Sequence, residues 1–316
     1  GVHSDKVQIK YGVPQGSVLG PILFSIYMTP LGDILRAHNS KFHQYADDQQ
    51  LYTAFKPTEA NLISTVANVN RCLADVTSWM IQNFLQFNGD KTEILICGTR
   101  QQLAKITVDT IQLGDSTISV TQSARNLGVI FDSNMNMNAH ITKLCQIGHM
   151  HLRNIVSVRK YLTQDAAESL VHAFVTSRLD CCNSLLYNTS GIKKLQSLQN
   201  SAARVITGTR KYEHITPVLK QLHWLKIPFR IEFKLCVFMY KVLHGQAPQY
   251  LCELISIKMP TRSLRSNSRS LVSVPRTKNV TCGDRAFSVV GPRLWNSLPQ
   301  HVQDCDKLDA FKKFLK

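Results

Sequence analysis

Residues 42–53 carry the sequence FHQYADDQQLYT, in which apolar or aromatic residues stand on either side of Ala46-Asp47-Asp48. This pattern predicts two short strands joined by a tight turn, with two adjacent carboxylates at the tip of the hairpin. Two uncompensated anions repel each other and lose hydration when they are buried, so the pair needs a counter-charge. A hard divalent cation such as Mg²⁺ supplies that charge and prefers carboxylate oxygen. An ordinary solvated turn is the alternative interpretation of an Asp-Asp pair.

Helices and strands alternate around this hairpin. Residues 7–11 predict a strand, and the apolar residues 17–35 predict a buried helix. A long helix is predicted from Pro57-Thr58 to a turn at Asn88-Gly89, with an apolar stripe at Leu62, Val66, Val69, Leu73, Val76, Met80 and Phe84. Further strands are predicted at residues 92–96, 106–113, 118–121 and 126–131, with a turn at Gly114-Asp115.

After about residue 138 the pattern becomes helical. One apolar stripe is predicted at Ala167, Leu170, Phe174, Cys181 and Leu185, and another at Leu195, Leu198, Ala202 and Val205, closed by Gly208. A third helix is predicted over residues 229–242, and the Ser- and Arg-rich residues 258–278 predict a basic loop. We therefore expect an α+β fold with three parts: residues 1–137 of mixed structure, a helical region at 138–257, and a C-terminal segment at 258–316.

Charge divides the chain in a similar way. The formal net charge is +16, but residues 1–137 carry 10 lysines and arginines against 11 acidic residues, whereas residues 138–316 carry 27 against 10. A basic region beside a carboxylate cluster is typical of an enzyme that binds a polyanion and acts on it with metal ions. A solvated basic surface is the alternative.

The remaining composition argues against export. No secretory signal is recognisable, and no apolar run approaches the length of a bilayer span. The 9 cysteines are odd in number and form no Cys-x-x-Cys pair, which favours reduced thiols inside the cell. His140, Cys145, His149 and His151 are the best metal-like cluster, but no second ligand pair completes a zinc set, so we expect an ordinary helix surface there.

Five motifs, which follow one another along the chain, together resemble the motifs of a known protein family. The hairpin 45–48 and the sequence GVPQGSVLGP at residues 12–21 resemble motifs C and B of reverse transcriptases, and this form of motif B resembles the LINE-type (non-LTR) retrotransposons. Residues 88–92, NGDKT, are similar to motif D, and residues 126–129, NLGV, to the Leu-Gly hairpin that holds the primer. Residues 286–288 and 292–299 are similar to the C-terminal signature of jockey-related elements.

The resemblance implies a partial polymerase palm, with an antiparallel sheet and helices, followed by a basic helical thumb. It implies that Asp47 and Asp48 are catalytic metal ligands for Mg²⁺, with Mn²⁺ as the alternative ion, and that Lys91 lies near the leaving pyrophosphate. Template and nucleotide would lie against Pro14, Gln15, Gly16 and Tyr45, and the primer against Leu127 and Gly128. The nucleic-acid backbone would contact Lys193, Lys194, Arg204, Arg210 and Lys211.

The implied partners are an RNA template, a DNA primer and deoxynucleoside triphosphates, with no membrane, and the family implies a nuclear location. The sequence leaves the oligomeric state open. The alternative roles of single residues are ordinary: a turn glycine at Gly16, a surface lysine at Lys91 and a core leucine at Leu127. Trp295 and Phe287 are predicted to pack rather than to stack on bases.

The expected activity of the isolated chain is low. Reverse transcriptases also need an Asp of motif A, and the only candidate, Asp5, is too close to Gly12 for the intervening helix to fit. We expect a fragment of an RNA-directed DNA polymerase that is inactive alone. The alternatives are a non-catalytic nucleic-acid-binding relic and a pseudogene-derived chain without function. A telomerase-like or intron-maturase-like polymerase is disfavoured by the C-terminal signature.

Overall fold

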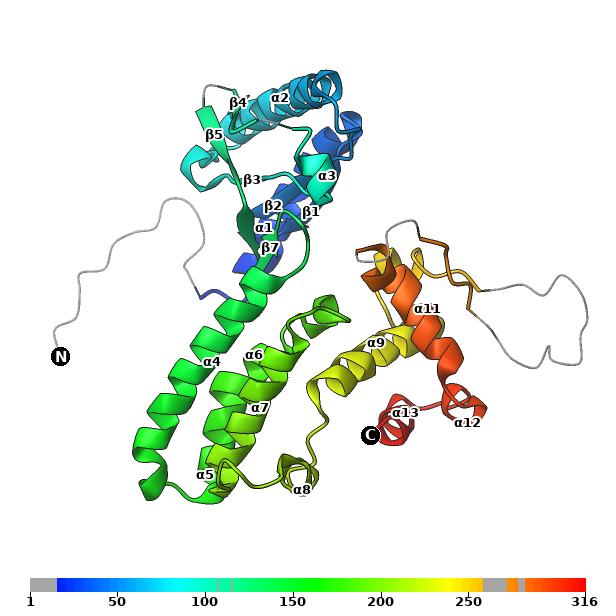
Figure 1. Cartoon of the computed structure of the whole chain (residues 1–316). Helices are drawn as coiled ribbons and strands as arrows, with labels where there is room; N and C mark the ends of the chain where they lie inside the picture. Colours follow the sequence, from blue (N-terminus) through cyan, green and yellow to red (C-terminus); the bar gives the residue numbers. More distant parts are fainter. Residues whose placement is uncertain (1–15, 107, 115, 258–271, 278–281) are drawn as a thin grey trace, which may run out of the picture. The chain divides into compact units, whose positions relative to one another are not determined.

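The computed structural model describes residues 16–257, 272–277 and 282–316, except residues 107 and 115. Helices dominate and short strands lie in the first half of the chain, which confirms the predicted mixed α+β class (Figure 1). The chain divides into two compact units, Gly1–Leu127 and Gly128–Lys316. No helix in the described ranges is long and apolar enough to cross a membrane.

The N-terminal unit combines two long helices with short strands. Its elements are α1 (Gly20–Ala37), β1 (Lys41–Tyr45), β2 (Asp48–Tyr52), α2 (Glu59–Gln82), η1 (Gly89–Lys91), β3 (Ile94–Leu95), α3 (Arg100–Leu103), β4 (Thr110–Leu113), β5 (Ser116–Thr121) and β6 (Ser123–Asn126). Its core lies between α1 and α2 and contains Met28, Leu31, Leu35, Cys72 and Val76. Phe42 and Leu51 pack against this core, so it supports the β1–β2 hairpin.

The prediction that α1 is buried was wrong for most of its length. The helix packs one stripe against α2 and β1, while Ile22 is 56% exposed and Ile26 is 64% exposed. A helix with apolar residues on all sides can bury only the stripe for which it finds partners. Tyr27 lies on this helix and its hydroxyl donates to the backbone oxygen of Asn83, which joins α1 to the end of α2.

The stripe of α2 ends earlier than predicted. Asn83 caps the helix, Phe84 adopts φ +54° and is 97% exposed, and the N–H of Leu85 donates to the backbone oxygen of Met80 at 2.8 Å. A left-handed residue followed by this long-range bond is a common helix stop. Phe84 is therefore outside the helix and does not belong to its apolar stripe.

The strands differ from the predicted antiparallel sheet in two respects. β4 pairs antiparallel with β5, but β3 pairs parallel with β5, and the β1–β2 hairpin is a separate two-stranded sheet. The strand predicted at residues 126–131 is interrupted, because Leu127 and Gly128 both have positive φ, at 46° and 85°. The side chain of Asn70 in α2 bonds the backbone of Gln112 and Gly114, which holds β4 against the helix.

The C-terminal unit is helical after a single strand. Its elements are β7 (Val129–Asp132), α4 (Asn138–Val158), η2 (Arg159–Tyr161), α5 (Gln164–Val171), the π-helical segment η3 (His172–Thr176), α6 (Ser177–Asp180), η4 (Asn183–Leu186), α7 (Ile192–Thr207), α8 (Ile215–Gln221), α9 (Ile227–Leu243), α10 (Gln249–Cys252), η5 (Gly283–Arg285), α11 (Phe287–Ser297), α12 (Gln300–Gln303) and α13 (Leu308–Phe314). Val129 and Met137 are buried in the same cluster as Ile141 of α4, so this unit begins about ten residues before the predicted boundary at 137.

Two glycines allow α4 and α7 to pack closely. A Cβ on Gly148 would lie 2.5 Å from Cδ2 of Leu198, and one on Gly191 would lie 2.6 Å from Cδ1 of Ile141. Leu198 and Ile141 are each 1% exposed and have no room to move away. Figure 1 shows the two helices side by side. The guanidinium of Arg159 donates to the backbone oxygens of Val205 and Ile206, which satisfies carbonyls near the end of α7.

The π-helical segment corrects the stripe predicted for residues 167–185. Val175, at 1% exposed, and Leu186, at 1%, are buried, whereas the predicted Phe174 and Leu185 are 43% and 42% exposed. The buried side chains Ala167, Val171, Val175 and Leu179 recur every four residues through this segment, and Leu186 lies in η4, beyond the end of the helix. Cys181 is also exposed, because α6 ends at Asp180.

The helices after α9 form a second core within this unit. Trp295 of α11 is 4% exposed and Phe311 of α13 is 0% exposed, and their ring centroids lie 5.7 Å apart. Phe287 packs edge-on against Phe238. The prediction that Trp295 and Phe287 are packing residues is confirmed. The predicted basic loop at 258–278 lies mostly outside the described residues, but Val272 is buried and its backbone bonds the side chain of Asn296.

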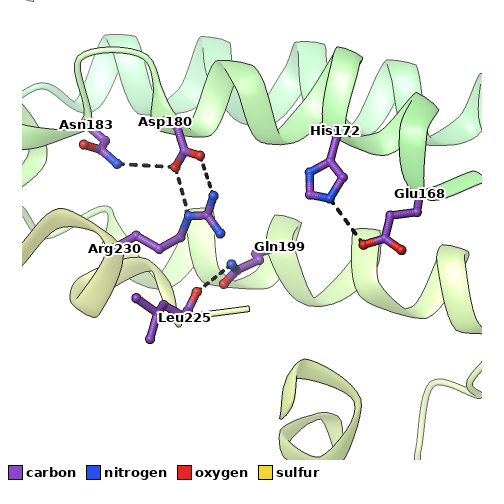
Figure 2. Close-up of polar contacts among 7 residues, drawn as sticks. All are labelled: Glu168, His172, Asp180, Asn183, Gln199, Leu225 and Arg230. Carbon is purple, nitrogen blue, oxygen red and sulfur yellow. Dashed lines mark hydrogen bonds and ion pairs between the residues drawn. The ribbon is translucent and has the colours of Figure 1, made fainter. Parts of the chain in front are cut away.

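A half-buried ion pair joins the end of α6 to α9. Arg230 Nε donates to Asp180 Oδ1 at 2.9 Å, and its Nη2 donates to Asp180 Oδ2 (Figure 2). The amide of Asn183 lies 3.5 Å from the same Oδ1. Nearby, Nε2 of the buried Gln199 donates to the backbone oxygen of Leu225, which joins α7 to the chain entering α9.

Replacement of Arg230 by Met should remove the ion pair and keep most of the apolar stem. Hydrogen bonds to charged groups contribute about 1.5–3 kcal/mol, and the partial exposure of Asp180 places the expected loss of unfolding free energy near the lower end. Urea denaturation measures it. The exposed Arg178 is a matched control on α6, and an equal effect of Arg178→Met would contradict this role of the pair.

His140 is buried near the start of α4, and its Nδ1 accepts the N–H of Ile130 at 3.3 Å. Burial lowers the pKa of His140 below the ordinary 6.5, so the native ring is neutral. His140 therefore contributes to the structure of this unit through its burial and this hydrogen bond. Among the described residues, no group of three or more His, Cys, Asp or Glu side chains could hold a metal ion.

His140 predicts a pH-dependent stability. Because its folded pKa is lowered, its contribution is present above pH 6.5 and is lost as the pH falls, when the unfolded chain binds the proton more readily. The free energy of unfolding should decrease between pH 7 and pH 5, and His140→Gln should reduce that dependence. The exposed His149 provides the control, since His149→Gln should leave the dependence unchanged. A His140→Gln profile parallel to the wild-type profile would refute the assignment.

Candidate functional site

The Asp-Asp pair lies at the tip of the β1–β2 hairpin, as the sequence predicted. Tyr45 pairs with Asp48 across the strands, so Ala46 and Asp47 form a two-residue loop. Ala46 adopts φ +54°, which such a loop requires at its first position and which glycine usually supplies. Tyr45, Asp47 and Asp48 are all exposed. The hairpin therefore presents two carboxylates and an aromatic ring to solvent from a short, antiparallel support.

The two carboxylates are suited to a hard cation. Neither Asp47 nor Asp48 takes part in an ion pair with any residue that the structure describes. Mg²⁺ keeps several waters and is commonly held by one or two carboxylates together with substrate phosphates. Two adjacent carboxylates without a protein counter-charge fit that requirement, and the electrostatic repulsion between them favours a bound divalent ion.

The structure brings the predicted primer-contacting turn toward the hairpin. Asn126 Nδ2 donates to Gln50 Oε1 at 2.7 Å, across 76 positions of sequence. Gln50 lies two residues after Asp48, and Asn126 immediately precedes Leu127, which is 50% exposed. Asn126 belongs to the predicted motif NLGV, but Gln50 and its contact with Asn126 were missed by the sequence analysis, since nothing local relates residues so far apart. Leu127 is exposed, so its alternative interpretation as a core leucine was wrong.

Lys91 ends the short η1 helix and is exposed. Its N–H donates to Oδ1 of Asn88 at 3.2 Å, and the hydroxyl of Thr92 donates to the backbone oxygen of Asn88. Asn88 therefore shapes this turn. No hydrogen bond or ion pair between Lys91 and Asp47 or Asp48 is present among the described residues.

The predicted template-binding residues lie at the edge of the described chain. Gly16 is exposed and adopts φ +92°, a conformation that strains any residue with a Cβ. Its interpretation as a turn glycine is compatible with that geometry. Pro14 and Gln15 lie outside the described residues.

The predicted backbone-contacting cations lie on α7 and the loop after it. Lys193, Lys194, Arg210 and Lys211 are exposed, whereas Arg204 is half-buried and donates to the backbone oxygens of Arg210 and Glu213. A groove of about 710 Å³ between α4 and α7 is lined by apolar and neutral polar residues together with two cations, Arg153 and Lys194. Arg204 thus holds the loop in place, while Lys194 faces a groove open to solvent.

Replacement of Ala46 by Gly should stabilise the hairpin. A left-handed conformation costs an L-residue about 1 kcal/mol, and glycine avoids most of that cost. Amide hydrogen exchange of residues 41–52 should slow by up to about fivefold. Ala54, which is exposed outside the hairpin and has negative φ, is the control, and Ala54→Gly should not slow exchange. Unchanged or faster exchange in Ala46→Gly would show that the loop is unstrained.

Comparison with known proteins adds to this geometry. Residues 2–131 match the family described as reverse transcriptase (RNA-dependent DNA polymerase). The chain is 27% identical over 226 residues to the probable RNA-directed DNA polymerase from transposon BS of Drosophila melanogaster, covering 68% of the chain and 24% of that protein. It is 24% identical over 230 residues to the corresponding protein from transposon X-element of the same organism, covering 69% and 24%. No solved structure matches the chain.

The Asp-Asp hairpin lies inside the matched residues 2–131, and this part of the chain belongs to the reverse transcriptase family, whose members are RNA-directed DNA polymerases and hence nucleotidyltransferases. Both curated relatives are transposon proteins, which supports the resemblance of the sequence to LINE-type (non-LTR) retrotransposons. Because the similarity to the transposon BS protein covers 68% of the chain, it extends past residue 131 into the helical unit. The chain spans 24% of the length of the curated relatives that it matches.

Proposed function

We propose that the chain is part of a reverse transcriptase in which Asp47 and Asp48 bind the metal ions of template-directed nucleotidyl transfer. The observation that carries the proposal is the exposed carboxylate pair at a two-residue hairpin tip, inside the segment that matches the family. Side chains that form no ion pair with the described residues are free to coordinate an ion that arrives with its substrate phosphates. Mg²⁺ is the proposed ion, with Mn²⁺ as the alternative.

The neighbouring residues would position the substrates. When bound, divalent metal supplies charge stabilisation at the attacking and leaving oxygens of the transfer. The exposed ring of Tyr45, paired with Asp48, offers a flat surface beside the incoming nucleotide, and Pro14, Gln15 and Gly16 would lie against the template. Leu127 and Gly128 would hold the primer end, a role supported by the Asn126–Gln50 bond that ties this turn to β2. Lys91 would donate a proton to the leaving pyrophosphate.

The two parts of the chain would act as palm and thumb. Residues 1–137 would form a partial palm with motifs B to E, residues 138–257 a thumb-like region, and residues 258–316 a basic segment with the C-terminal signature. Lys193, Lys194, Arg204, Arg210 and Lys211 would contact the backbone of an RNA template paired with a DNA primer. The support is electrostatic, since α4 and α7 contain no acidic residue and border a groove lined by Arg153 and Lys194. Target-primed DNA synthesis implies a nuclear location.

Residues 1–316 alone should not polymerise. A two-metal site requires carboxylates from more than one strand, and Asp5 is the only acidic residue before Asp33. Catalysis of this kind depends on positioning, so two carboxylates on one hairpin hold the ions poorly. A basic, non-catalytic nucleic-acid-binding protein is the second candidate, favoured by the 27 lysines and arginines of residues 138–316.

Primer extension on a poly(A) template with Mg²⁺ tests the proposal. The protein would be assayed as residues 1–316 and in a form extended upstream with the sequence that contains a motif A carboxylate. We expect extension only from the longer form, and Asp47→Ala should lower its rate by at least on the order of 10²-fold. Asp109→Ala is the control, because Asp109 is an exposed carboxylate outside the hairpin and should leave the rate unchanged.

Three outcomes would each contradict a part of the proposal. Extension by residues 1–316, abolished by Asp47→Ala, would show that no further carboxylate is needed. Equal rates for Asp47→Ala and Asp109→Ala in the longer form would remove Asp47 from the catalytic site. Absence of extension from both forms, with salt-sensitive nucleic-acid binding retained, would favour the non-catalytic candidate.

A further inference from the structure

Two exposed tyrosines lie at one end of the α4–α7 pair. Tyr161 ends η2, directly after α4, and Tyr212 lies in the loop after α7. Each residue is 76% exposed. Large aromatic rings that stand this far out of a folded surface have lost no water on folding, so their exposure does not contribute to the stability of the unit.

Each ring has a cation beside it. Lys160 Nζ lies 4.8 Å from the ring centroid of Tyr161, and Arg210 Nη1 donates to the hydroxyl of Tyr212 at 2.7 Å. Lys160, Arg210 and Lys211 are themselves exposed. Each tyrosine therefore presents a flat aromatic face next to a positive charge, a combination that attracts groups with both a π-surface and an anion.

Backbone contacts hold both tyrosines near the end of α7. Arg159, two residues before Tyr161, donates to Val205 and Ile206 of α7. Arg204 of α7 donates to the backbone oxygens of Arg210 and Glu213, on either side of Tyr212. The N–H of Arg210 donates to Oε1 of Glu213 at 3.0 Å, so the carboxylate of this loop is engaged in a hydrogen bond. The segments that carry the two ring–cation pairs are therefore both joined to the last turns of α7.

We propose that Tyr161 and Tyr212, with Lys160, Arg210 and Lys211, form a binding surface for single-stranded nucleic acid. Unpaired bases stack on the tyrosine rings while the cations contact the adjoining phosphates. A duplex presents phosphates but keeps its base faces stacked internally, so it would use the cations and not the rings. The surface lies outside residues 2–131 and does not use Asp47 or Asp48. In the proposed function the protein binds a primer–template duplex, and this surface would be an additional site for an unpaired strand.

Fluorescence anisotropy with residues 1–316 and labelled oligonucleotides tests the surface. The probes are a 12-nucleotide oligo(U) RNA, the equivalent oligo(dT) DNA and a blunt 12-base-pair duplex. The variants are Tyr161→Ala, Tyr212→Ala and the double change, with Tyr250→Ala as the matched control, because Tyr250 on α10 is 62% exposed and is not part of the surface. Thermal unfolding of each variant verifies that the fold is retained.

Stacking predicts a specific pattern of losses. Each alanine change should weaken single-strand binding by at least about fivefold and duplex binding by less than twofold, because only unpaired bases reach the rings. Tyr161→Phe should bind as the wild type, since stacking needs the ring and not the hydroxyl. Arg210→Ala and Lys211→Ala should each reduce the slope of log K against log salt concentration by somewhat less than one unit in magnitude. The tyrosine changes should leave this slope unaltered.

Some results would overturn the inference. If Tyr161→Ala and Tyr212→Ala bind single strands as Tyr250→Ala does, the rings have no role. If they weaken single-strand and duplex binding equally, the surface contacts phosphates and bases do not stack on its rings. A larger loss for RNA than for DNA, or the reverse, would assign the strand to the template or to the primer side. Asp47→Ala should bind all probes as the wild type, so failure here is separable from failure of the catalytic proposal.

Discussion

The C-terminal unit depends on the close approach of α4 and α7, which is permitted only because Gly148 and Gly191 lack side chains at the points of contact. A Cβ on Gly148 would lie 2.5 Å from a methyl carbon of the buried Leu198, and a Cβ on Gly191 would lie 2.6 Å from a methyl carbon of the buried Ile141. Both distances are far shorter than van der Waals contact. Hydrogen bonds join the other helices of the unit to this pair. Arg159 closes the end of α7 with two backbone bonds, and Gln199 joins its middle to the entrance of α9. The Asp180–Arg230 pair then fixes the end of α6 on α9 (Figure 2).

The same helix pair concentrates positive charge. α4 and α7 contain lysine, arginine and histidine and no acidic residue, so their shared groove has no internal counter-charge. Close packing places Arg153 of α4 and Lys194 of α7 along one groove, and fixing their positions in the fold reduces the entropy lost when a polyanion binds. The N-terminal unit has the opposite arrangement, since the carboxylates of Asp47 and Asp48 occupy a hairpin tip that is supported by a small core of α1 and α2. In the proposed function the carboxylates would bind metal and the cations would bind phosphate.

Local pattern predicted some elements well and others poorly. The hairpin, most of α2, α7 and α9 follow from local patterns of apolar and polar residues. The stripe at Phe174 and Leu185 failed because the buried positions recur every four residues through the π-helical segment His172–Thr176, and because the helix ends at Asp180, before Leu185. Phe84 failed for a similar reason, since the helix stops in a left-handed residue that is not glycine. The burial of α1 was overestimated because an apolar sequence does not say how many of its faces find a partner.

By itself the sequence determined the residue types on which function depends. Adjacent carboxylates in a turn, motifs in the order of a reverse transcriptase, and helices rich in lysine and arginine are all properties of near neighbours in the chain. Only the tertiary structure decided which of these residues are accessible and which are engaged. It exposed Leu127 beside a bond between Asn126 and Gln50, used Arg204 to hold a loop, buried Trp295, and left Tyr161 and Tyr212 on the surface with cations beside them. The physical reason is that burial and pairing depend on contacts between segments far apart in sequence, which no local period encodes.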